Sequence, residues 1–111
     1  MATAIFVTFQ VERIHCWPDA DDEVKYLRSL HRHIFHWHVK ISVKHDDREI
    51  EFIQFRSECI AVVNAVVPFK STMSCEQMAL AFLERMKGKY KGRAFEVTVS
   101  EDGENGAVVT A

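Results

Sequence analysis

Apolar and polar residues alternate along two stretches in the first half of the chain. The stretch from Ala4 to His15 carries β-branched or aromatic residues at alternate positions, a pattern that predicts a strand. The stretch from His31 to Lys44 has one apolar and one polar face, as in a sheet packed on one side. Because successive side chains of a strand point to opposite faces, we expect His15, His31 and His33 on the apolar faces.

Two later stretches repeat apolar residues at steps of three and four, which predicts helices. The first runs from about Ile53 to Val66. The second begins after Ser74, which is expected to cap the helix and to form a capping box with Gln77. Gly88 and Gly92 are expected to end it.

Short alternating segments and turn residues fill the rest of the chain. Phe95–Val99 predicts a third strand and Ala107–Thr110 a fourth, which completes a hairpin. The turn signals Asp102-Gly103 and Asn105-Gly106 lie between them. Between the first two strands, Glu23–Leu30 predicts a short helical turn. The predicted order is β-β-α-α-β-β, in a single domain spanning residues 1–111.

Composition and charge narrow the class of partner. The 111 residues are 48% hydrophobic and 27% charged, which is typical of one globular domain with its own core. The formal net charge is -2, so the sequence offers no electrostatic attraction to nucleic acid. No apolar run approaches the roughly 20 residues of a membrane span, and the first residues lack a signal-peptide pattern. We therefore expect a cytoplasmic protein with neither a nucleic-acid nor a membrane partner.

The three cysteines are not a disulfide framework, because they are odd in number and widely spaced. No C-x-x-C pair occurs, which excludes a zinc ribbon. Cys59 and Cys75 are expected to be packed helix residues. Cys16 differs from these two cysteines in its position, because it directly follows His15.

The histidines of the two apolar faces are candidate metal ligands. His31 and His33 are two residues apart, so both can chelate one ion from the same face of a strand. With His15 from the neighbouring strand they make three ligands and leave one open position, the arrangement of catalytic zinc. The alternative is that the buried imidazoles are satisfied by carboxylates or backbone groups. A second H-x-H pair, His36 and His38, lies on the polar face and is expected to be solvated.

Five short motifs give the chain a resemblance to the 6-pyruvoyl-tetrahydropterin synthase and 6-carboxytetrahydropterin synthase family. The resemblance covers nearly the whole chain, in family order. The motifs are Val11-Glu12-Arg13-Ile14-His15, Leu30-His31-Arg32-His33, Ile50-Glu51-Phe52, Ser74-Cys75-Glu76 and Val99-Ser100-Glu101-Asp102.

The resemblance implies a tunnelling fold (T-fold), with a four-stranded antiparallel sheet and two helices on one face. It also implies a zinc ion held by His15, His31 and His33. Glu101 would anchor the pterin ring, because a carboxylate accepts two hydrogen bonds from a fork of N–H groups. The same resemblance assigns Ser74 and Glu76 to substrate binding.

Family members assemble into rings, so the resemblance also implies a homo-oligomer, a trimer or a hexamer. The implied reaction is that of a lyase in queuosine or tetrahydrobiopterin biosynthesis. It eliminates triphosphate from dihydroneopterin triphosphate and rearranges the side chain.

The chain departs from the family at the groups that transfer protons. Leu27 stands where the family has its catalytic cysteine, and Val66–Met73 contains neither member of the family's Asp-His pair. Arg32 replaces the glycine between the two ligand histidines. Glu12 lies at an offset where some family members carry a glutamate, and it is the expected general base if a bulge or bend turns it toward zinc. Cys16 is a weaker alternative.

Three functions follow from these residues. The first is a zinc-dependent, synthase-like enzyme acting on a pterin. The second is a catalytically inactive module of the same fold that binds a pterin or purine, since the usual proton relay is missing. The third is a generic α/β domain whose buried histidines are structural.

Overall fold

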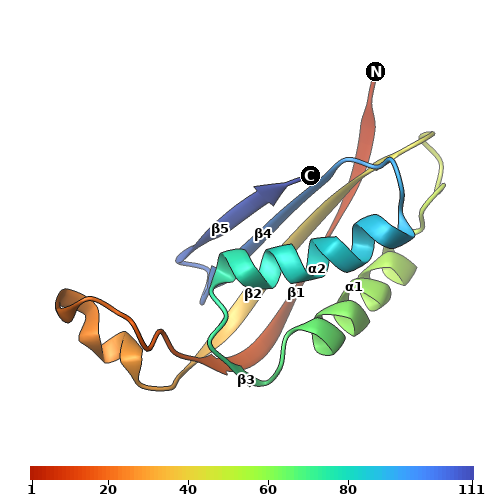
Figure 1. The fold of residues 1–111 in the computed structure, drawn as a ribbon. Coiled ribbons are helices and arrows are strands. Elements are labelled where there is room, and N and C mark those ends of the chain that lie inside the picture. Colours follow the sequence, from red (N-terminus) through yellow and green to blue (C-terminus); the bar gives the residue numbers. More distant parts are fainter.

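One five-stranded sheet, in the order β3-β1-β2-β4-β5, carries the other elements of the fold. The computed structural model describes residues 1–111. In chain order the elements are β1 (Thr3–His15), the 3-10 helix η1 (Asp22–Arg28), β2 (His31–Val43), α1 (Phe52–Val66), β3 (Lys70–Ser71), α2 (Cys75–Lys89), β4 (Phe95–Glu101) and β5 (Asn105–Thr110) (Figure 1). This arrangement confirms the expected mixed α+β class.

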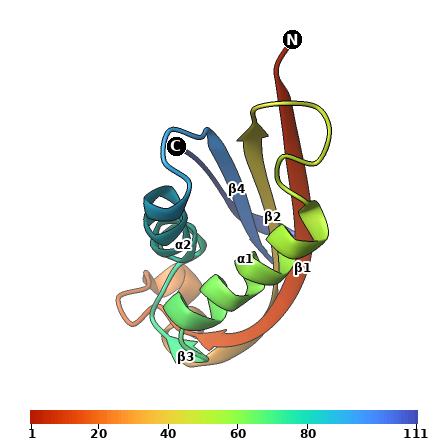
Figure 2. The ribbon, with the colours of Figure 1, turned by 90° about the vertical axis from the view of Figure 1, so that its right-hand side faces the viewer.

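Both long helices cover the same face of the sheet, and η1 projects from one end (Figures 1 and 2). Phe55, Cys59 and Val63 of α1 are buried against the sheet, as the helical periodicity predicts. Alternate residues of the long strands meet the helices and form the other half of the core. These sheet residues are Val7, Phe9, Phe35, Trp37, Val39, Ile41, Phe95, Val97 and Val99.

The pairing of β1 with β2 is continuous. It runs antiparallel from Thr3 opposite Val43 to His15 opposite His31, with no extra residue in either strand. A strand without a bulge keeps its alternation from end to end. His15 therefore lies on the same face of β1 as Val7 and Phe9, as the alternation predicts.

The sheet has five strands, so the expected four-stranded, wholly antiparallel sheet is wrong. Lys70 and Ser71 form β3, which lies parallel to β1 beside Ile14 and His15. The backbone N–H of Ile14 donates to the carbonyl of Phe69 at 2.8 Å. Because backbone N–H groups need partners, this short strand covers the last two residues of the β1 edge. A two-residue strand has no periodicity, which is why the segment looks like a plain connection in the sequence.

The final hairpin turns at the first of the two dipeptides that predict a turn. Asp102 and Gly103 form the turn with φ of 55° and 75°, as expected of that dipeptide. Asn105-Gly106 lies inside β5 instead, with Gly106 opposite Ser100. Gly106 is needed because β4 passes very close to it. A Cβ there would stand 2.1 Å from the carbonyl oxygen of Val99.

The helix boundaries agree closely with the sequence pattern. Ser74 and Gln77 form the predicted capping box. The helix continues through Gly88 to Lys89, and Gly92, with φ of 77°, shapes the following turn. No helix is both long and apolar enough to cross a membrane.

Two glycine-to-alanine substitutions are expected to shift stability in opposite directions. Gly106→Ala should lower the free energy of unfolding by about 1–3 kcal/mol, because the methyl group meets the backbone of β4. Gly88→Ala should raise it by about 0.5–1 kcal/mol, since no atom lies within 4 Å of a Cβ there and alanine favours the helix. Urea unfolding of both variants measures the difference. A Gly106→Ala variant as stable as the parent would contradict the close approach of β5 to β4.

Candidate metal centre

Three imidazole rings meet where β1 ends and β2 begins. His15, His31 and His33 each offer one ligand atom, and these atoms lie within 4.8 Å of one another. The rings stand edge to face, with centroids 4.6 Å apart for His15 and His31 and 5.0 Å apart for His31 and His33. Phe35 lies beneath the cluster, fully buried and edge-on to two of the rings. Sequence alternation and strand register together produce this convergence.

Each of the three rings is held by its Nδ1 atom. The Nδ1–H of His15 donates to the carbonyl of Met73, that of His31 to the carbonyl of Ser29, and both distances are 2.8 Å. The Nδ1–H of His33 donates to Oδ2 of Asp102 at 2.7 Å. All three partners are acceptors, so Nδ1 carries the proton in each ring and a neutral ring presents a lone pair at Nε2. This is the outer-shell arrangement that orients histidines toward a metal.

The three Nε2 atoms are buried and have no hydrogen-bond partner. An unpaired buried nitrogen is costly, and three of them converging in one place need a common partner. A metal ion accepts lone pairs from all three at once. The donor set therefore fits a metal ion, and hydrogen bonds to carbonyls and a carboxylate satisfy only the opposite side of each ring.

Asp102 is the functional residue that sequence analysis missed. Its Oδ1 accepts from the backbone N–H of Ile34 at 2.9 Å while Oδ2 holds His33. The hydrogen bond from His33, followed by that from Ile34, holds the pKa of Asp102 below its usual range. Its left-handed backbone, φ 55°, is tolerated by aspartate. In the sequence this residue gives a turn signal and ends a family-like motif. Its contact with His33 is concealed because the two residues lie 69 positions apart.

Glu101 lies at the mouth of the same cluster. Its Oε1 is 3.3 Å from Nε2 of His15, and its Oε2 is 3.3 Å from Nε2 of His33. It is the last residue of β4 and stands opposite Phe35 in the sheet register. The structure thus brings Glu101 together with the three histidines.

Glu12 is on the other side of the sheet. It precedes His15 by three positions in an unbulged strand, and its carboxylate pairs with Arg32. The bulge that would turn Glu12 toward the histidines is not present. Its role as a general base stays a prediction, and this arrangement does not support it.

Neither Leu27 nor Cys16 supplies a proton-transfer group in place of the family's catalytic cysteine. Leu27 lies in η1, where its carbonyl accepts from the backbone N–H of Trp17 at 2.7 Å. Cys16 follows β1, and its backbone N–H donates to the carbonyl of Ser71. No contact joins its thiol to the histidines.

The residues assigned to substrate at the start of α2 are beside the cluster but do not touch it. Ser74 caps the helix, with its Oγ accepting from the backbone N–H of Gln77. Glu76 is exposed in the first turn. Between them Cys75 is buried, and this burial, then the charge of Glu101, raises the pKa of its thiol to about 12. The thiol therefore stays protonated near neutral pH.

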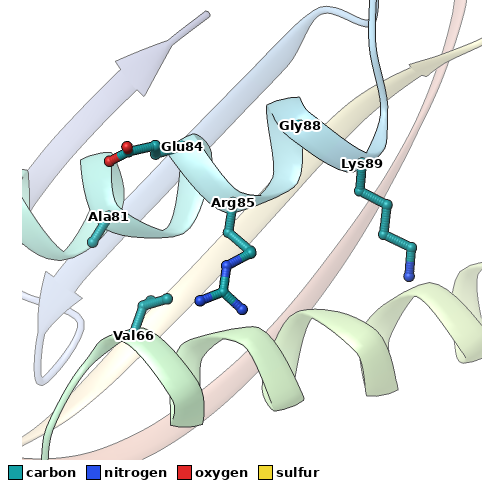
Figure 3. A pocket seen from close by; sticks show the side chains of 6 residues that line it. All are labelled: Val66, Ala81, Glu84, Arg85, Gly88 and Lys89. Atoms are coloured by element: carbon teal, nitrogen blue, oxygen red, sulfur yellow. The ribbon is translucent and has the colours of Figure 1, made fainter.

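An open groove lies elsewhere on the molecule, between the two long helices. Its volume is about 700 Å³, and Arg85 and Lys89 reach across it from α2 (Figure 3). Its lining residues are Val66, Ala81, Glu84, Arg85, Gly88 and Lys89. None of the histidines borders it, so the groove is separate from the metal centre.

No protein-family model matches the chain, and no curated protein sequence matches it.

The substitution Asp102→Asn is expected to weaken metal binding by about 10–100-fold, because it removes the charge that orients His33. Asparagine tolerates the left-handed backbone as aspartate does, so the turn should survive. Competition with a chromogenic chelator measures the affinity. Asp46→Asn, in an exposed turn away from the site, is the matched control. Equal affinities in the two variants would contradict the role given to Asp102.

Proposed function

We propose that this protein binds one zinc ion through His15, His31 and His33 and acts on a pterin, in the manner of the tetrahydropterin synthases that its motifs resemble. The observation that carries the proposal is the convergence of three buried, unpartnered Nε2 atoms. Zinc is the first choice because three imidazoles suit its preference for nitrogen ligands and for tetrahedral geometry. The order of the five family-like motifs supports the pterin as substrate class.

The proposed reaction eliminates triphosphate from dihydroneopterin triphosphate and rearranges its side chain. A bound zinc ion supplies Lewis-acid polarisation of the substrate's side-chain oxygens. In the resemblance, the Glu101 carboxylate holds the pterin ring through paired hydrogen bonds. Its position beside the histidines agrees with a site at this end of the sheet.

We extend the proposal to a T-fold ring of identical subunits, a trimer or a hexamer. β1 has a neighbour on its outer edge only at Ile14 and His15, and β5 has none on its outer edge. Unpaired strand edges favour pairing with another chain, and ring closure covers both. Sedimentation equilibrium tests the assembly, and a monomer at micromolar concentration would refute it.

A catalytically inactive pterin- or purine-binding module is the second candidate function. The observation that favours it is the arrangement of proton-transfer groups. Glu12 pairs with Arg32 on the opposite face, and Leu27 occupies the usual cysteine position. The chain then keeps the metal centre and lacks the relay that a lyase needs.

Metal content tests the centre directly. The purified protein is expected to contain about one zinc ion per chain, and His15→Ala, His31→Ala and His33→Ala should each lose most of it. His36→Ala and His38→Ala, with the same spacing on the other face, are the matched controls and should retain it. Mass spectrometry of metals after dialysis measures the ratio. Unchanged zinc in the His33→Ala variant would overturn the site.

Turnover separates the two functions. If the protein is a lyase, incubation with dihydroneopterin triphosphate should release inorganic triphosphate, and His33→Ala should reduce that release by at least about 100-fold because the Lewis acid is lost. Glu12→Gln tests the general base in the same assay. Binding of neopterin by calorimetry without any turnover would establish the module and refute the lyase.

A further inference from the structure

Glu101 continues the apolar face of β4 into the metal centre. Phe95, Val97 and Val99 alternate along the buried side of this strand, and Glu101 is the next residue on that side. The pairing of Glu101 with Phe35 sets it beside His33, which precedes Phe35 by two positions in β2. The Glu101 side chain is 30% exposed, so water reaches only part of it and a positive partner or hydrogen-bond donors would stabilise the rest.

Glu101 contacts the two histidines through carboxylate oxygens, which are acceptors, and in a neutral ring Nε2 is an acceptor too. Each of its oxygens is 3.3 Å from an Nε2 atom, one on His15 and one on His33. Those nitrogens have no hydrogen-bond partner. In a neutral ring with its proton on Nδ1, the lone pair of Nε2 faces a lone pair of the carboxylate. That arrangement is repulsive unless a cation lies between the two atoms.

The two distances between Glu101 and the histidines match those between ligands of one zinc ion. Zinc binds imidazole nitrogen at about 2.0–2.1 Å and carboxylate oxygen at about 2.0–2.2 Å, and a tetrahedral angle then places neighbouring ligand atoms roughly 3.3–3.5 Å apart. The measured distances of 3.3 Å lie at the lower end of this range. No other carboxylate contacts an Nε2 atom of the cluster.

We propose that Glu101 is the fourth protein ligand of this metal ion, so that the centre is a closed His₃Glu site in the absence of substrate. This proposal rests on the metal centre of the proposed function and changes the part played by one residue. The resemblance assigns Glu101 to the pterin ring. The same carboxylate cannot fill both roles at once, so a pterin held by Glu101 must first displace it from the metal.

Cobalt-substituted protein tests the fourth ligand without reference to activity. Glu101→Ala should lower Co²⁺ affinity at least about tenfold in chelator competition, since a direct ligand is worth no less than an outer-shell partner. It should also open a position to azide, which shifts the visible absorption of Co²⁺. The unsubstituted protein should not respond to azide at the same concentration.

Glu104→Ala is the matched control, because this exposed carboxylate lies in the same hairpin and forms no ion pair with the histidines. Glu101→Gln is the second variant and keeps the shape of the side chain. If Glu101→Ala does not fold, the glutamine variant carries the test, and the same loss of affinity and gain of azide binding are expected.

The outcomes separate this proposal from the one on which it rests. If the histidine variants lose the metal but both Glu101 variants bind Co²⁺ within twofold of the parent, the three-histidine site stands and the fourth ligand is refuted. Azide binding to the unsubstituted protein would also refute it. If His33→Ala retains the metal, both proposals fail together.

Discussion

The uninterrupted pairing of β1 with β2 is the constraint on which the candidate centre depends. His15 is the last residue of β1 and His31 the first of β2, and the register places them opposite each other. His33 follows on the same face, two positions along. A slip of one residue in this pairing would send one strand's ligands to the other face of the sheet. The buried apolar residues of β1 and β2 that fix this register, such as Val7 and Phe35, therefore also position the histidines.

Ring orientation depends on three separate pieces of chain. The carbonyls of Ser29 and Met73 and the carboxylate of Asp102 each accept from one Nδ1–H. Ser29 follows directly after η1, Met73 precedes α2, and Asp102 is in the β4–β5 turn. The metal centre thus requires both strands, the start of a helix and a hairpin to be in place together. Such a centre forms with the fold, so a metal ion held there would also stabilise the folded chain.

The two faces of the sheet carry different chemistry. The core face ends in the histidines and Glu101, with buried nitrogen lone pairs and a carboxylate. The opposite face carries Arg32 paired with Glu12, and His38 stacked on Phe6 with ring centroids 5.0 Å apart. The two H-x-H pairs of β2 share a spacing, yet only the first has unpartnered buried nitrogens. Location on a face, rather than spacing, distinguishes a metal-binding pair.

Much of the fold and the three ligand histidines could be predicted from the sequence alone. Strand alternation assigns His15, His31 and His33 to one face, and helical spacing assigns Phe55 and Val63 to the core, because these periods are local properties of the chain. Only the tertiary structure decided that Lys70 and Ser71 add a parallel strand, that Asp102 holds His33, and that Glu101 reaches two Nε2 atoms. Those contacts join residues between 56 and 86 positions apart, and no local pattern in a single sequence records which distant groups the sheet brings together.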